Sequence, residues 1–161
     1  MRSRSLIPAL VASAIVLGCG GSSEQSDTGG VEVIITTTPT NGIATIGASG
    51  GALFSPEGAG ISFPPGALSV DQRIEIAESL AVSPSSMRPL GQTVDFLPRD
   101  LALVEGHPAT IQLPLPMGTT AAVVYLSRSD ESGWDLVGGA SWAGSVKVDV
   151  SHLGTAFAAA P

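Results

Sequence analysis

Side chains that could do chemistry are few in this chain of 161 residues. It has a single cysteine, Cys19, and two histidines, His107 and His152. One cysteine excludes an internal disulfide and a CxxC redox or metal site, and we expect no zinc site from these three residues. Each of them is therefore judged by its own neighbours in the sequence.

Cys19 follows a stretch typical of an exported protein. A basic start with Arg2 and Arg4 precedes an apolar run of 12 residues from Leu6 to Leu17. A bilayer span takes about 20 residues, so the run fits the apolar region of a signal peptide better. The residues Val16-Leu17-Gly18-Cys19 then resemble the lipobox of bacterial lipoproteins, although the commonest lipoboxes carry Ala or Ser where Leu17 stands.

The lipobox resemblance implies cleavage after Gly18 and a diacylglyceryl thioether on Cys19, often with an acyl group on the new N-terminus. Several acyl chains anchor a protein durably, whereas one chain gives only marginal attachment. An ordinary secretory signal with an incidental cysteine is the alternative. Because Gly20 and not aspartate follows Cys19, the resemblance implies the outer membrane as the address.

Residues 1–18 are thus assigned to the signal, and residues 19–30 to the lipidated cysteine and a Gly/Ser-rich tether with nothing to bury. Such a tether reaches roughly 17 to 20 Å. Loss of Arg2 and Arg4 reduces the 7 basic residues to 5, against 14 acidic ones, a formal charge of −9. This charge argues against nucleic acid as a partner and against attraction to anionic lipid. The lipid is expected to be the only membrane link.

Period-two alternation, 20 glycines and 12 prolines predict short strands joined by tight turns. The stretch 50–68, where glycine and proline turns separate apolar runs, predicts two strands. Further strands are predicted at 31–38, 73–78, 110–115, 145–150 and, more continuously apolar and central, 121–126. We expect an all-β fold over residues 31–161, an antiparallel β-sandwich of about 8–10 short strands.

The order of these motifs resembles a ZU5 domain over about residues 48–158. Its opening signature looks like Gly50-Gly51-Ala52-Leu53 followed by Gly60-Ile61-Ser62-Phe63-Pro64-Pro65-Gly66-Ala67-Leu68. Strands at 73–78, 108–114 and 133–136 and a closing segment at 150–157 keep the same order. The resemblance implies that Trp134 packs in the core and that the domain has an interaction or structural role. Death domains, UPA domains and ankyrin repeats are not recognisable, so the chain resembles bacterial ZU5-like lipoproteins.

Some ZU5-related domains cut their own backbone at a His-Phe-Ser element. The matching positions here are His152, Leu153 and Gly154. Glycine has no hydroxyl, and Thr155 is one residue too late to attack the same bond. The resemblance therefore implies no self-cleavage, and His152 is expected at a strand end as a surface or hydrogen-bonded residue.

Other catalytic or metal-binding constellations are weak. Neither His107 nor His152 lies near a Gly-x-Ser-x-Gly elbow, so a hydrolase is not favoured. Asp130, Glu131 and Asp135 form the densest acidic cluster, without the spacing of a calcium loop, and are interpreted as a solvated turn. We predict no enzyme, no metal and no cofactor.

Trp142 is the candidate ligand contact, since it lies in a predicted hairpin between Gly138-Gly139 and Gly144. Sugars stack on exposed aromatic faces, so a carbohydrate-binding lipoprotein would need Tyr125 or another aromatic beside Trp142. Aromatics are only 4% of the chain, which disfavours a long glycan groove. The sequence predicts a lipid-anchored envelope protein with a non-catalytic ZU5-like module and a protein or glycan partner. A carbohydrate-binding lipoprotein is the alternative, and an autoproteolytic or hydrolytic domain is the least favoured.

Overall fold

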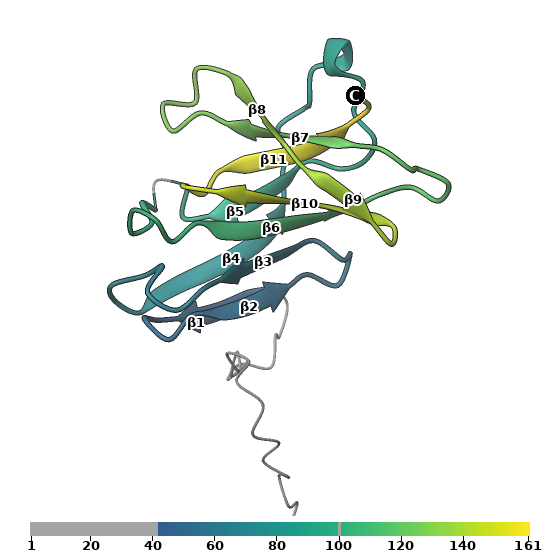
Figure 1. Ribbon diagram of the computed structural model, residues 1–161. Coiled ribbons are helices and arrows are strands. Elements are labelled where there is room, and N and C mark those ends of the chain that lie inside the picture. Colours follow the sequence, from purple (N-terminus) through teal and green to yellow (C-terminus); the bar gives the residue numbers. More distant parts are fainter. Residues whose placement is uncertain (1–41, 100) are drawn as a thin grey trace, which may run out of the picture. The chain divides into compact units, whose positions relative to one another are not determined.

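The computed structural model describes residues 42–99 and 101–161 (Figure 1). These belong to the second of the two units into which the chain divides, Glu32–Pro161. The signal, Gly18, Cys19, the tether and the strand predicted at 31–38 lie outside the described residues. No helix in the described part is long and apolar enough to cross a membrane.

Eleven strands and one 3-10 helix follow one another in the described residues. In chain order they are β1 (Ile43–Ile46), β2 (Gly51–Phe54), β3 (Gly60–Phe63), β4 (Gln72–Glu78), η1 (Ser85–Met87), β5 (Val94–Leu97), β6 (Ala109–Pro114), β7 (Val123–Ser127), β8 (Trp134–Gly138), β9 (Ala140–Trp142), β10 (Ser145–Val150) and β11 (Thr155–Ala159).

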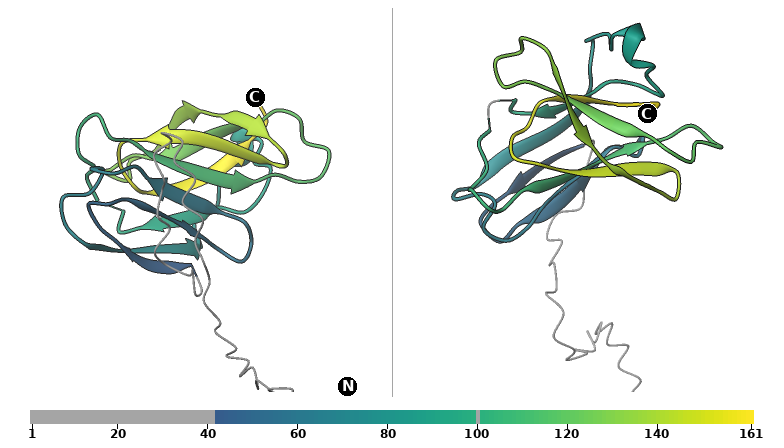
Figure 2. Two further views of the ribbon diagram at one scale, coloured as in Figure 1. Left: turned by 60° about the horizontal axis from the view of Figure 1, so that its bottom comes forward. Right: turned by 45° about the horizontal axis from the view of Figure 1, so that its top comes forward.

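The strands form two antiparallel sheets that pack as a sandwich (Figures 1 and 2). The six-stranded sheet has the order β1-β4-β5-β11-β7-β8, and the five-stranded sheet has the order β2-β3-β6-β10-β9. The predicted all-β, antiparallel sandwich is confirmed. The strands slightly outnumber the prediction, partly because Gly139 divides one extended segment into β8 and β9, which belong to different sheets.

Alternation along the strands matches their two environments. On β10, Val146 is buried while Lys147 and Asp149 face solvent, as the period-two pattern predicts. Strand β7 begins two residues later than predicted and alternates, with Tyr125 only half-buried. The strand with every residue buried is instead β11, which lies inside the six-stranded sheet between β5 and β7.

The core lies between the sheets and consists of aliphatic and phenylalanine side chains. Burying such surface is the main favourable term in folding, at about 25 cal/mol per Å² of apolar area. The largest fully buried side chains of this core are Leu53, Ile61, Phe63, Ile74, Phe96, Ile111, Leu113, Val124, Leu126, Val146 and Leu153.

Both lateral sides of the sandwich are crossed by a segment that bends from one sheet into the other. Residues 47–50 connect β1, an edge of the six-stranded sheet, to β2, an edge of the five-stranded sheet. On the opposite side, Gly139 connects the edge strands β8 and β9. Gly139 has a φ of 135°, and an added Cβ would come 2.7 Å from Val146 Cγ2, so only glycine fits this bend.

Candidate functional site

A polar network lies on the outer face of the six-stranded sheet, centred on Asp95. Asp95 is 8% exposed; it accepts a hydrogen bond from Thr155 Oγ1 at 2.6 Å and one from Arg99 at 2.8 Å. Arg99 also donates to Glu131 at 3.0 Å. These hydrogen bonds, to Asp95 first and then to Glu131, raise the pKa of the Arg99 guanidinium above its ordinary value. The network ties β5, β11 and the loop before β8 together, which is a structural task.

His152 is half-buried beside Ser127, at the end of β7. Its Nε2 lies 3.1 Å from the carbonyl oxygen of Ser127, whose hydroxyl accepts a hydrogen bond from the Thr155 N–H at 2.9 Å. Gly154 faces the same hydroxyl, because a Cβ added there would come 2.6 Å from Ser127 Oγ. The space that a nucleophilic side chain at position 154 would need is therefore occupied by Ser127.

The remaining titratable candidates are spread over separate loops. His107 is exposed, and its ring packs against Gly66. In the acidic cluster, Asp130 accepts hydrogen bonds from the backbone and hydroxyl of Ser132, at 3.0 and 2.7 Å, and Asp135 accepts one from Arg128 at 2.8 Å. Within residues 42–99 and 101–161, no three metal-ligating side chains come together.

Three aromatic side chains pack on the outer face of the six-stranded sheet. The Tyr125 ring is stacked on the Phe157 ring at 5.4 Å between centroids, and Trp134 meets Phe157 edge-on at 4.8 Å. The core position predicted for Trp134 is wrong: its ring is half-buried and packs on this outer face, not between the sheets. Tyr125 lies in this cluster and does not share a face with Trp142.

Two exposed aromatic side chains lie instead on the outer face of the five-stranded sheet. Trp142 on β9 is 77% exposed, and Phe54 on β2 is 43% exposed. Phe54 lies over Gly60 of the neighbouring strand, because a Cβ added to Gly60 would come 2.5 Å from the ring. Phe54 was not singled out from the sequence. Since Leu53 points into the core, period-two alternation places Phe54 outward and could have identified it.

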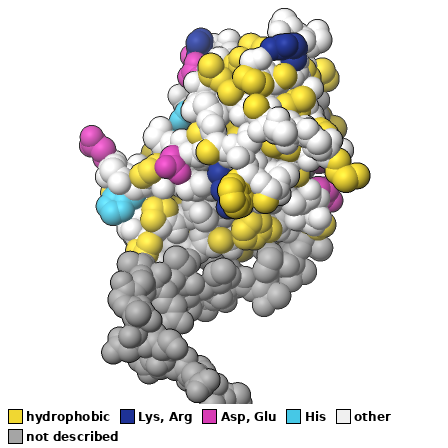
Figure 3. All heavy atoms as spheres, turned by 45° about the vertical axis from the view of Figure 1, so that its right-hand side comes forward, with side chains coloured by type: hydrophobic (Ala, Val, Ile, Leu, Met, Phe, Trp, Pro, Cys, Tyr) yellow, Lys and Arg dark blue, Asp and Glu magenta, His cyan; other side chains and the backbone are white. Residues whose placement is uncertain are grey.

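Polar side chains fill the surface between these two aromatics. Phe54, Gly60, Gln112 and Lys147 are successive cross-strand neighbours, on β2, β3, β6 and β10. On the last strand, β9, Trp142 pairs with Ser145, which lies two residues before Lys147. A shallow depression of about 60 Å³ lies beside Phe54, Gln112 and Lys147. We name the face formed by Phe54, Gln112, Lys147 and Trp142 the aromatic face. Hydrophobic side chains also reach the surface at several places in the view of Figure 3, with few charged groups among them.

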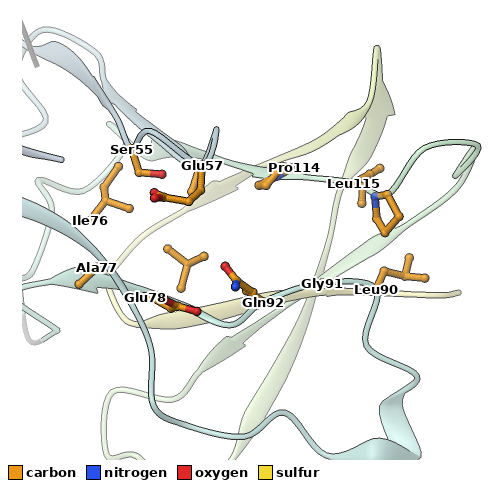
Figure 4. Close-up of a pocket in the computed structure, with 13 residues that line it drawn as sticks. Ser55, Glu57, Ile76, Ala77, Glu78, Leu90, Gly91, Gln92, Pro114 and Leu115 are labelled. Carbon is orange, nitrogen blue, oxygen red and sulfur yellow. The ribbon is translucent and has the colours of Figure 1, made fainter. Parts of the chain in front are cut away.

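A larger pocket, of about 280 Å³, opens at one end of the sandwich. The turn between β2 and β3 and the end of β6 form one wall, and the segments around Glu78 and Gln92 form the other (Figure 4). This pocket could not be predicted from the sequence, because its walls come from segments far apart in the chain.

A scan against protein-family models finds no match for this chain, and a search of curated proteins finds none either. The aromatic face and the end pocket are therefore the candidate binding surfaces of the described residues.

Proposed function

We propose that this chain is a lipid-anchored protein of a bacterial envelope, held in the outer membrane, whose ZU5-like β-sandwich is a non-catalytic binding module. The short signal and the placement of Cys19 directly after Gly18 support the anchor. The Gly/Ser-rich residues 20–30 supply the reach from the membrane to the domain.

The observation that carries the binding role is the exposure of two large aromatics on one sheet face. Leaving Trp142 77% exposed does nothing for folding, because the side chain buries little apolar area. Tryptophan is among the residues that contribute most to binding interfaces, since it combines a large apolar face with a hydrogen-bond donor. By contrast Asp95, Arg99 and His152 are already engaged in hydrogen bonds within the fold.

Metabolic labelling with a palmitate analogue tests the anchor. We expect the wild-type chain to be labelled and to fractionate with outer membranes, and the Cys19→Ala chain to be unlabelled and released. A wild-type chain that is unlabelled and not membrane-bound would instead support the ordinary secretory signal.

A photo-crosslinking amino acid at position 142 or 54 tests the aromatic face in cells. The matched control is position 73 on β4, a strand of the other sheet. The side chain of Arg73 is 69% exposed, so a probe there is also accessible. We expect discrete adducts from positions 142 and 54 and none from position 73. Equal adduct yields at all three positions would refute the aromatic face as the binding surface.

A second candidate function, carbohydrate binding, is favoured by the spacing of the two aromatics. Phe54 and Trp142 lie on strands four steps apart in the sheet, or about 19 Å at 4.8 Å per step. Stacking on both rings, with Gln112 and Lys147 donating to hydroxyls between them, suits an extended oligosaccharide. We expect Trp142→Ala and Phe54→Ala each to abolish retention on the cognate insoluble polysaccharide, whereas Leu80→Ala, at a 98% exposed loop position, leaves it unchanged. Undiminished retention of both aromatic variants would exclude this function for the face.

A further inference from the structure

The end pocket opens directly into the core of the sandwich. Ala59, Ile76 and Val94 belong to the buried core, and all three line the pocket. Leu90 and Leu115, which pack against the core from the loops, line it as well. An apolar recess with a few polar groups is the usual form of a small-molecule site.

Rows of core-facing side chains end in polar residues at this pocket. On β4, Glu78 follows the buried Ile76 by two residues and therefore lies on the same, core-facing side. Gln92 stands two residues before the buried Val94, which pairs with Glu78 in the ladder. Glu78 and Gln92 are themselves exposed, so they form a polar rim above the apolar floor of the recess.

Apolar side chains line the whole length of the pocket, and its two acidic groups lie toward one end. Figure 4 shows Glu57 on one wall and Glu78 and Gln92 on the facing wall, with Leu90 and Leu115 at the far end. Among the described residues, no ion pair involves Glu57 or Glu78. The arginines that form ion pairs contact other carboxylates. Two exposed carboxylates at the mouth of one recess, neither of them in an ion pair with another described residue, favour a cation.

We propose that this pocket binds a small organic cation with an apolar body, such as an alkyl or aromatic amine. Its ammonium group is held between Glu57 and Glu78, and its body lies against Leu90 and Leu115. The volume of about 280 Å³ is just below the range of about 300–1,000 Å³ typical of drug-sized ligands, so the body is a short chain or a single ring. The inference depends only on the fold, and it stands whether or not the anchor and the aromatic face are correct.

Hexylammonium, hexanol and hexanoate are three probes of equal length that test the charge preference. The full chain with Cys19→Ala, which removes the proposed lipid, is titrated and followed by ¹H–¹⁵N NMR. The side-chain amide of Gln92 and the backbone N–H of Gly91 report from inside the pocket. We expect hexylammonium to shift these signals with an affinity about tenfold higher than that of hexanol, because hydrogen bonds to charged groups are the stronger ones. Hexanoate is expected not to bind.

Three variants distinguish binding of hexylammonium in the pocket from its non-specific attraction to an acidic protein. Glu78→Gln is expected to weaken hexylammonium binding about five- to tenfold, whereas Glu105→Gln, at an exposed acid outside this pocket, leaves it unchanged. Gly91→Leu is expected to block hexylammonium and hexanol alike, because a Cβ there would sit 3.9 Å from the Pro114 carbonyl, facing the opposite wall.

Equal affinities for hexylammonium and hexanol, an unaltered affinity in Glu78→Gln, or the absence of any shift at Gln92 would each overturn the proposal. If Gly91→Leu does not fold, the Glu78→Gln and Glu105→Gln pair still decides the question.

Discussion

Replacing Asp95 by alanine should be among the most damaging polar substitutions in this domain. The change removes the acceptor of the 2.6 Å bond from Thr155 and of the 2.8 Å bond from Arg99. Thr155 is only 4% exposed, so its hydroxyl would be left buried without a partner, at a cost of about 1–3 kcal/mol. Because Arg99 is 39% exposed, solvent screening limits the loss of its bond to about 1 kcal/mol. We therefore expect Asp95→Ala to cost about 3 kcal/mol.

Equilibrium unfolding in urea measures this cost, and the fold supplies a matched control. Thr110 and Asp149 form the same kind of cross-strand pair with the same 2.6 Å bond, but on an exposed surface. Asp149→Ala should therefore cost only about 0.5 kcal/mol. With a slope of about 1.5 kcal/mol/M, the urea midpoint should fall by about 2 M for Asp95→Ala and by about 0.3 M for the control.

A double variant tests the physical reason. Thr155→Val removes the hydroxyl that Asp95→Ala leaves unpaired, so the combined variant should lose about 1–2 kcal/mol less than the sum of the two single variants. Equal costs for Asp95→Ala and Asp149→Ala, or strict additivity in the double variant, would refute the argument from burial.

Three further predictions concern other contacts. Gly154→Ala should destabilise the domain by about 1–3 kcal/mol in urea unfolding, because the added Cβ would lie 2.6 Å from Ser127 Oγ; a neutral effect would contradict that packing. Phe157→Ala should cost about 3–5 kcal/mol by the same measurement, since the ring is fully buried between Tyr125 and Trp134, and a loss below about 1 kcal/mol would mean that the cluster is loose. Hydrogen bonds from the Ser132 hydroxyl and backbone lower the pKa of Asp130 in the folded protein. The ionised carboxylate therefore stabilises the fold at a pH above the pKa that Asp130 has in the unfolded chain, and this stability is lost as the pH falls through its pKa in the folded protein. Carboxyl ¹³C titration should show that pKa rising in Ser132→Ala, and an unchanged pKa would assign the shift to another cause.

Much of the sandwich could be predicted from local patterns. Strand β10 occupies the predicted residues 145–150, β4 begins one residue before its prediction, and β6 is shifted by one residue at both ends. These strands have one buried and one wet face, which is what alternation encodes. Burial of β11 on its outer face depends on neighbours from other strands, such as the Tyr125 and Trp134 rings against Phe157, and those contacts are not local. The ZU5 resemblance remains a prediction.

The candidate sites were harder to predict, because they are assembled across strands. Trp142 was identified by its hairpin, but its partner on the same face, Phe54, lies at the other edge of the sheet. Glu57, Glu78 and Gln92 reach one pocket from three separate loops or strand ends. No spacing along the chain links such residues, whereas Gly18 and Cys19 are adjacent and could be interpreted without a structure.

The two bends at residues 47–50 and at Gly139 determine how the domain can loosen. Each bend joins an edge strand of one sheet to the neighbouring edge strand of the other. Separation of the two sheets along either side is therefore limited by a covalent connection. Partial opening is restricted to the ends of the sandwich, where loops carry exposed side chains such as Leu80 and Met117. Small molecules would therefore enter or leave this domain through its ends, where the end pocket also lies.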